Sequence, residues 1–392
     1  MEECEIIFQL FFSENEISNQ FMFWIGCVAT HPFSMYTIVY SIVEKGVKGG
    51  QNLRYPEFLG KNGNIGFVAP SLGCTTEPYR TAFDKALDKF RQDGYNTIIG
   101  PNCYEAKGMG ISNTPELCGQ ELNEMYCDSQ ADIIISCGGG ELMCEVVPYI
   151  DFDRISTSRP KWYMGYSDNT NFTFLSNILS DTAAIYGPCA GTFSMEPMHE
   201  SVQDAYDLLK GEKQSISGYE MWERDSLKDE DHPTVPLNLT EKTLIRRFPD
   251  KDTVIEGRLL GGCLDCLANL VGTEYDKVGE FADRYREDGI IWFLEACELN
   301  VMTIRRTLWN LKNAGWFKHV KGFLVGRPLC FGEECFGVDQ YSAVTGVLGD
   351  YNVPIIMDMD IGHFSPMMPI VSGATAKVIV EGNNIKIDYT WQ

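Results

Sequence analysis

Histidine and basic side chains are scarce in this sequence. Five histidines occur among 392 residues, and 32 lysines and arginines stand against 55 aspartates and glutamates, for a formal net charge of −23. Nucleic-acid binding needs clustered Lys and Arg to contact phosphates, so this charge argues against it. A hydrophobic fraction of 44% and a chain of this length are instead typical of a globular protein of about two domains.

Metal and phosphate-binding motifs are missing as well. Fourteen cysteines occur, but Cys263 and Cys266 form a C-x-x-C pair with no second pair at zinc-finger spacing. We therefore expect no metal, no cofactor and reduced thiols, as in the cytoplasm. Residues 138–140 are three glycines, yet G-x-G-x-x-G and a Walker lysine are absent, which favours a structural turn or an oxyanion loop over a phosphate cradle.

The N-terminal part differs from the rest of the chain. Residues 17–43 contain no charged side chain, which would suit a membrane anchor. Polar residues and the pair His31-Pro32 interrupt this run, and acidic residues replace the basic region of a signal peptide. We interpret residues 1–60 as an atypical extension of a cytoplasmic protein. A membrane anchor and a true start at Met35 are the alternatives.

Strand and helix patterns alternate from residue 61 to residue 210. Short apolar runs predict strands at 65–69, 97–99 and 133–136, and amphipathic spacing predicts helices at 77–92 and 114–127. Such alternation predicts a parallel sheet with helices on both faces, as in flavodoxin-like and Rossmann-like domains.

A second α/β domain, richer in strands, is expected at residues 254–392. Its pattern contains helices at 263–271 and 302–314 and a terminal hairpin of strands at 376–380 and 385–389. The polar segment 211–253 connects the two domains and is too long for a passive linker. We expect the active site between the domains.

The most informative segment is Gly165-Tyr166-Ser167-Asp168-Asn169. It follows a β-prone run and precedes a run that can begin a helix, so Ser167 is expected on a sharp strand-to-helix turn. A serine on such a turn exposes its hydroxyl, and the next backbone N–H faces whatever the hydroxyl attacks. The segment differs from the hydrolase motif G-x-S-x-G at Asn169, and an ordinary turn is the alternative.

Two later strand ends supply partners for this serine. Glu295 ends the apolar run 289–294, and His363 follows a glycine after an apolar strand pattern. The other histidines lie in N-terminal, loop-like or helix-end contexts: His31, His199, His232 and His319. The chain order Ser, Glu, His matches a known triad order, although His363 could also be a surface or capping residue.

Six segments in order resemble the serine-peptidase family of LD-carboxypeptidases, and within it the branch of microcin self-immunity peptidases. They are Ile65-Gly66-Phe67-Val68-Ala69-Pro70-Ser71, Ile133-Ile134-Ile135-Ser136-Cys137-Gly138-Gly139-Gly140, Gly165-Tyr166-Ser167-Asp168, Gly257-Arg258-Leu259-Leu260-Gly261-Gly262-Cys263-Leu264, Phe293-Leu294-Glu295, and Gly362-His363 with Pro369-Ile370-Val371-Ser372-Gly373-Ala374. The resemblance implies a triad of Ser167, Glu295 and His363. It also implies an oxyanion hole made by the backbone N–H groups of Asp168 and Gly139, and a homodimer.

Three positions depart from the usual family pattern and bear on substrate preference: Glu141, Cys263 and Ala296. Trp222 lies in the connecting segment, where the immunity branch stacks an aromatic residue on a nucleotide; a packing role is the alternative. Arg306 lies on an expected helix and could bind a substrate carboxylate, with plain surface charge as the alternative.

We therefore predict a serine carboxypeptidase that removes the C-terminal residue from a small peptide such as a murein tetrapeptide. One alternative is hydrolysis of peptidyl or aminoacyl nucleotides, as in the immunity branch. Another is a non-catalytic binding protein on the same scaffold. Neither nucleic acid nor membrane is expected as a partner.

Overall fold

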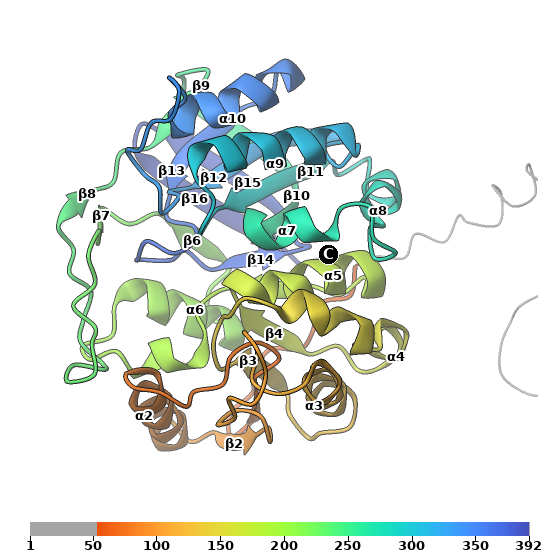
Figure 1. The fold of residues 1–392 in the computed structure, drawn as a ribbon, viewed down its shortest axis with the longest axis vertical. Coiled ribbons are helices and arrows are strands. Elements are labelled where there is room, and N and C mark those ends of the chain that lie inside the picture. Colours follow the sequence, from red (N-terminus) through yellow and green to blue (C-terminus); the bar gives the residue numbers. More distant parts are fainter. Residues whose placement is uncertain (1–52, 392) are drawn as a thin grey trace, which may run out of the picture. The chain divides into compact units, whose positions relative to one another are not determined.

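Two β-sheets organise residues 53–391, the part of the chain that the computed structural model describes (Figure 1). The membrane-anchor alternative and the start at Met35 concern residues that lie outside the described range. None of the described helices is long and apolar enough to cross a membrane. Residues 53–60, which the sequence assigned to the extension, pack on the first sheet, with Leu59 buried and Phe58 stacked on Trp162.

The first sheet has six strands in the order β14-β5-β4-β3-β1-β2. They are β1 (Asn64–Val68), β2 (Asn96–Ile99), β3 (Ile133–Ser136), β4 (Trp162–Gly165), β5 (Ala184–Tyr186) and β14 (Ile370–Ser372). Strands β1 to β5 are parallel in the flavodoxin-like order 2-1-3-4-5, and β14 is antiparallel to β5. Every residue of β3 and β4 is buried, which explains their continuous apolar runs.

Five α-helices belong to this half of the described chain: α2 (Tyr79–Gln92), α3 (Pro115–Cys127), α4 (Phe152–Thr157), α5 (Thr170–Ser180) and α6 (Glu200–Lys210). Helix α2 buries Phe83, Leu87 and Phe90, the apolar positions that predicted it. Helix α3 begins where the hydroxyl of Thr114 accepts the N–H of Leu117, with proline in the first turn.

The second sheet has eight strands in the order β6-β16-β15-β10-β11-β12-β13-β9. They are β6 (Ser215–Ser217), β9 (Arg246–Phe248), β10 (Thr253–Cys263), β11 (Ile290–Glu295), β12 (Val320–Gly326), β13 (Ile355–Met359), β15 (Thr375–Glu381) and β16 (Asn384–Thr390). Strands β10 to β13 are parallel, and the outer strands are antiparallel to their neighbours. Helices α9 (Val301–Asn313) and α10 (Gln340–Leu348) lie side by side on this sheet, with α7 (Leu264–Leu270) and α8 (Val278–Arg284) nearby (Figure 1).

Three strands belong to a sheet outside the segment or domain in which the sequence placed them. Strands β6 and β9 come from segment 211–253 yet form the two edges of the second sheet, and β14 comes from the C-terminal part yet pairs in the first sheet. The same segment adds a two-stranded ribbon of β7 (Met221–Trp222) and β8 (Glu241–Lys242). The predicted α/β fold, with an N-terminal parallel sheet and a β-rich C-terminal part, is confirmed; the domain boundaries stay a prediction.

Helix α5 joins the two sheets. Nearly all of its residues are buried, and the Thr170 hydroxyl in its first turn accepts the N–H of Cys263, at the end of β10, at 3.0 Å. The preceding Gly262 makes this approach feasible, because a Cβ there would lie 2.6 Å from the Thr170 methyl carbon. The carboxyl ends of β4 and β10 are therefore held close together.

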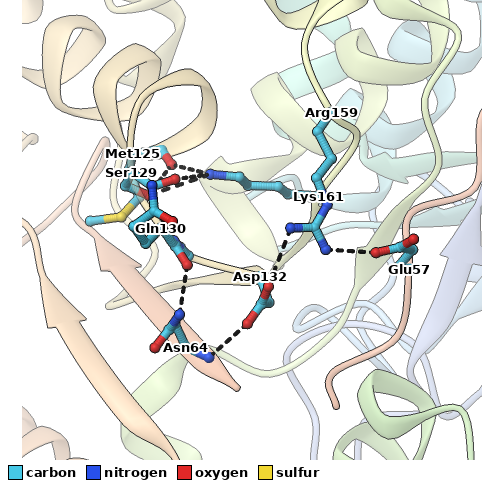
Figure 2. Close-up of polar contacts among 9 residues, drawn as sticks. Glu57, Asn64, Met125, Ser129, Gln130, Asp132, Arg159 and Lys161 are labelled. Atoms are coloured by element: carbon cyan, nitrogen blue, oxygen red, sulfur yellow. Dashed lines mark hydrogen bonds and ion pairs between the residues drawn. The ribbon is translucent and has the colours of Figure 1, made fainter. Parts of the chain in front are cut away.

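A polar network closes the opposite, amino-terminal end of the first sheet (Figure 2). Asp132, which precedes β3, accepts the backbone N–H of Asn64 at 2.8 Å. Arg159, which precedes β4, pairs with Asp132 at 3.3 Å and with Glu57 at 2.7 Å. The network fixes the starts of three neighbouring strands relative to one another.

Lys161 is the buried cation of this network. Its Nζ donates to the carbonyl oxygens of Met125 and Ser129, both at 3.0 Å, and so caps the C-terminal end of α3 (Figure 2). The side chain has no carboxylate within ion-pair distance among the described residues. Burial therefore lowers the pKa of Lys161 to about 8.

We predict that stability rises between pH 7.5 and pH 9.5 through Lys161. Its pKa is lower in the folded state than in the unfolded state, so protonation opposes folding below pH 8 and this penalty fades as the pH rises. The free energy of unfolding of wild type should gain ~2 kcal/mol over this range relative to Lys161→Met. Urea titrations at both pH values check this, with Lys318→Met as a control at an exposed ion pair. Equal pH dependence of Lys161→Met and wild type would contradict the prediction.

Candidate active site

Ser167 lies on the turn that the sequence predicted. Strand β4 ends at Gly165, and a short 3₁₀ turn, η3 (Ser167–Asn169), leads directly into α5. Ser167 has a φ of 62°, which is unfavourable for a residue with a side chain and persists only where the surroundings hold it. Its N–H donates to the hydroxyl oxygen of Tyr186 at 3.1 Å. The turn directs the serine out of the end of the sheet.

Glu295 is the last residue of β11, and its side chain is fully buried. Its Oε1 accepts the hydroxyl of Tyr186 at 2.5 Å, and its Oε2 lies 3.0 Å from Nδ1 of His363. The neighbouring Gly362 has a φ of 107°, and a Cβ there would lie 2.6 Å from Oε2. The close approach of this backbone to the carboxylate therefore requires glycine at position 362.

His363 follows β13 and links the two sheets. Its Nε2 lies 2.9 Å from Oγ of Ser167. Because Nδ1–H donates to the Glu295 carboxylate, Nε2 of the neutral ring accepts the hydroxyl of Ser167. Three side chains that are distant in sequence thus lie in one series of hydrogen bonds, in the arrangement expected for a nucleophile, a base and the group that orients the base.

The charges of this series stabilise each other. Burial alone raises the pKa of Glu295, but the charge and hydrogen bond of His363 and the hydroxyl of Tyr186 outweigh burial and lower it. Burial alone lowers the pKa of His363, and the Glu295 carboxylate overcomes burial and raises it above the ordinary histidine value. Burial raises the pKa of Tyr186, so its hydroxyl keeps its proton and donates it.

Gly139 and Asp168 lie where the sequence expected backbone donors. A Cβ at Gly139 would lie 3.3 Å from Oγ of Ser167, so this turn runs directly beside the serine. No acceptor for the N–H of Gly139 or of Asp168 occurs among residues 53–391. The backbone N–H groups of Gly139 and Asp168 are therefore free to bind a ligand oxygen. The Asp168 side chain is held separately: its buried carboxylate accepts the hydroxyl of Ser71 at 2.6 Å and the N–H of Met143 at 2.9 Å.

Carboxylates and thiols surround these donors. Partial burial and the nearby Glu298, Asp168 and Asp265 raise the pKa of Glu141. Within the described part of the chain, Glu141 has no lysine or arginine ion-pair partner. Cys263, one of the three positions that depart from the family pattern, donates its thiol to Asp265 at 3.3 Å. No described group of three or more His, Cys, Asp or Glu residues could hold a metal ion.

A small cavity of about 50 Å³ lies against His363 on the side of η4 (Ala190–Ser194) and α6. Its walls combine Tyr166 and apolar side chains with three hydroxyl-bearing residues, Thr192, Ser201 and Ser365; the apolar members are Pro188, Met195, Val202, Leu237, Pro366 and Met367. Leu237 belongs to the loop between β7 and β8, so this loop borders the site. The cavity is wide enough for a small apolar side chain.

The two residues predicted to bind substrate lie in different surroundings. Trp222 is 4% exposed and packs against Phe364 and Phe331, with the Arg327 guanidinium 5.0 Å from its ring centre. Arg306 is exposed on α9 and lines a separate groove of about 440 Å³ between α9 and α10. Stacking by Trp222 would require it to leave its aromatic cluster, and both roles stay predictions.

Tyr186 is the site residue that sequence reasoning missed. It receives the N–H of Ser167 and donates to Glu295, so it contacts two members of the series. Its only signal in the sequence is its position at the end of a short strand before a glycine. A tyrosine at the end of a strand is too common to indicate a site residue. Only the second sheet, which brings Glu295 beside Tyr186, identifies it as one.

The chain is similar in sequence to known peptidases along most of its length. Residues 65–187 match the LD-carboxypeptidase N-terminal domain and residues 256–378 the LD-carboxypeptidase C-terminal domain. The chain is 26% identical over 334 residues to the microcin C7 self-immunity protein of Escherichia coli, covering 82% of this chain and 92% of that protein. It is also 26% identical over 341 residues to a probable murein peptide carboxypeptidase of Bacillus subtilis, covering 84% and 93%.

A solved structure supports the same fold. The microcin C7 self-immunity protein in complex with glutamyl sulfamoyl guanosine superimposes with a TM-score of 0.69 at 21% identity, over 86% of this chain and 98% of that one. At this identity the likeness concerns the fold.

We predict that Tyr186→Phe slows the reaction of Ser167 with a fluorophosphonate probe by about tenfold or more. A hydrogen bond to a charged group contributes about 1.5–3 kcal/mol, and its loss leaves Glu295 and the serine turn less firmly held. Intact-mass spectrometry over time measures the labelling rate. Tyr126→Phe, at an equally buried tyrosine that contacts Lys161, is the control and should label like wild type. A wild-type rate for Tyr186→Phe would show that the hydroxyl has no positioning role.

Proposed function

Because the chain belongs to the LD-carboxypeptidase family, we propose that it is a serine peptidase that removes the C-terminal residue from a small peptide-like substrate. The observation that carries the proposal is the series of hydrogen bonds from Ser167 through His363 to Glu295, at 2.9 Å and 3.0 Å. In this series a nucleophile is hydrogen-bonded to a base, and the base is hydrogen-bonded to a buried carboxylate.

The proposed reaction begins with Ser167 as the nucleophile. Its Oγ attacks the carbonyl carbon of the last peptide bond, and Nε2 of His363 takes the hydroxyl proton. The Glu295 carboxylate stabilises the resulting imidazolium. The tetrahedral intermediate collapses, the C–N bond breaks, and the amine leaves with the proton from His363. Water then attacks the acyl ester with the same histidine as base, which releases the shortened peptide and restores Ser167.

The backbone N–H groups of Asp168 and Gly139 form the proposed oxyanion hole. Both donors lack an acceptor among the described residues, and Gly139 lies against Ser167. Donors that are already in place stabilise the negative oxygen without reorganisation, which is commonly the largest single contribution to such catalysis. The proposed mechanism uses no metal and no cofactor.

A murein tetrapeptide is the substrate we favour. A relative named as a probable murein peptide carboxypeptidase supports it, and the small cavity beside His363, lined by apolar and hydroxyl side chains, has room for an alanine methyl group. The alternative is an aminoacyl or peptidyl nucleotide, supported by the microcin self-immunity relative and by the nucleotide-like ligand in its structure. The third hypothesis is a non-catalytic binding protein. It is supported by Glu141, Cys263 and Ala296, which depart from the family pattern.

A homodimer and a cytoplasmic location are part of the proposal. The dimer comes from the family resemblance, and the location from the many unpaired cysteines, since all those in the described residues are free thiols. Sedimentation of the purified full chain at micromolar concentration distinguishes dimer from monomer.

We predict that Ser167→Ala abolishes turnover while the fold is kept. Loss of the nucleophile in a comparable triad costs on the order of 10⁶ in kcat. Glu295→Gln should cost on the order of 10⁴, because glutamine still holds the ring but favours the wrong tautomer. Wild type and both variants are incubated with murein tetrapeptide and with an aminoacyl-sulfamoyl adenosine, and products are measured by mass spectrometry.

Two outcomes would overturn the proposal. If Ser167→Ala keeps more than about a tenth of wild-type activity, far above the expected loss, the serine mechanism is wrong. If wild type cleaves neither compound, the substrate assignment fails and the binding-protein reading gains support. Faster turnover of the nucleotide compound would favour the immunity-type function.

We predict a pH profile governed by His363. The base must be neutral, and the Glu295 carboxylate raises its pKa, so kcat/KM should rise with pH to a midpoint above about 6.5, the ordinary histidine value. Glu295→Gln removes the charge and should move the midpoint to lower pH at a lower plateau. Glu298→Gln, at an exposed nearby carboxylate, is the matched control and should move it less. An unchanged midpoint in Glu295→Gln would contradict the proposed pairing.

A further inference from the structure

The peptide between Gly138 and Gly139 is anchored by its carbonyl group. The carbonyl oxygen of Gly138 accepts the side-chain amide of Asn169 at 2.9 Å and the hydroxyl of Ser136 at 3.0 Å. In a planar trans peptide the C=O and the N–H point to opposite sides. Holding the Gly138 oxygen therefore decides the direction of the Gly139 N–H, one of the two proposed oxyanion donors.

Asn169 can occupy its place in only one orientation. Its Oδ1 accepts the hydroxyl of Tyr163 at 2.5 Å, and the two hydrogens of Nδ2 serve the carbonyl oxygens of Gly138 and Tyr166, the latter at 3.0 Å. A flipped amide would direct its oxygen at both carbonyl oxygens. The side chain is fully buried, so water does not compete for these bonds.

The chain also leaves space for this side chain. A Cβ at Gly165 would lie 2.8 Å from Cγ of Asn169, so only glycine fits at the end of β4. Asn169 therefore connects the end of β4, through Tyr166, with the glycine turn after β3. These are the two segments that carry the nucleophile and the Gly139 donor.

We propose that Asn169 is a positioning residue for the oxyanion hole, acting through the Gly138 carbonyl and not by contact with substrate. The inference rests on the proposed serine mechanism and deepens it. The turn consists of three glycines, which rotate with little steric hindrance, so it needs an external anchor. If this peptide turned over, a carbonyl oxygen would face the developing oxyanion, and a donor would be replaced by a repulsive group.

The test uses Asn169→Ala and the nearly isosteric Asn169→Asp. Aspartate keeps an acceptor for Tyr163 but presents an oxygen to the Gly138 carbonyl, so it should be at least as harmful as alanine. For both variants we expect kcat to fall on the order of 10²-fold, the typical effect of losing one oxyanion donor, with KM within about threefold. Ser136→Ala removes the second anchor of the same carbonyl and should lower kcat less, since Asn169 remains.

Asn177 provides the matched control. It lies on α5, the helix that begins directly after Asn169, is equally buried, and donates Nδ2 to the carbonyl oxygens of Thr182 at 2.7 Å and Ser372 at 3.3 Å. Its Oδ1 accepts the hydroxyl of Ser372 at 2.6 Å. Asn177→Ala should cost similar stability but leave kcat within about threefold of wild type, because it anchors no donor of the oxyanion hole.

Labelling of Ser167 by a fluorophosphonate gives a second readout that needs no natural substrate, and Asn169→Ala should slow it relative to Asn177→Ala. If Ser167→Ala is inactive while Asn169→Ala loses no more kcat and no more labelling rate than Asn177→Ala, the positioning role is refuted and the serine mechanism stands. If wild type neither labels at Ser167 nor turns over either compound, the proposed function itself fails and this inference fails with it.

Discussion

The buried carboxylate of Glu295 is the constraint on which the site depends. A fully buried charge without partners destabilises a protein by several kcal/mol, so its oxygens must be matched. One partner, the Tyr186 hydroxyl, comes from the end of β5 in the first sheet. The other, Nδ1 of His363, comes from the loop after β13 in the second sheet. Satisfying this single charge thus requires that the carboxyl ends of both sheets face each other.

The strained serine turn is held by the same contacts. Ser167 keeps its left-handed φ because Tyr186 takes its N–H, and because the neighbouring Asn169 and Asp168 side chains are tied to surrounding segments. Asp168 connects the turn to Ser71, in the loop after β1. The loops after β1, β3 and β4 of a 2-1-3-4-5 sheet meet at its topological switch point, where open α/β sheets place their ligands.

The surroundings of the site bear on what it can accept. Beside His363 lies a small cavity lined by apolar and hydroxyl side chains, and near the glycine turn lie Glu141 and Glu298, without lysine or arginine ion-pair partners in the described range. The groove that Arg306 lines lies between α9 and α10 and is separate from this cavity. We propose that substrate preference depends on this cavity and on these carboxylates.

Much of this protein could be predicted from the sequence. Local patterns determined the strands and helices around β1 to β4, since period and length identify buried strands and amphipathic helices. Ser167, Glu295 and His363 were predicted as site residues because each lies at or just after the end of a predicted strand. The small number of histidines left few alternatives to His363 as the base. Only the tertiary structure decided that β14, from the end of the chain, completes the first sheet, that Trp222 is buried, and that Tyr186 lies between Ser167 and Glu295. Each of these features depends on at least one contact between residues about a hundred positions apart or more. Such contacts leave no periodic trace in the sequence, because packing selects their partners.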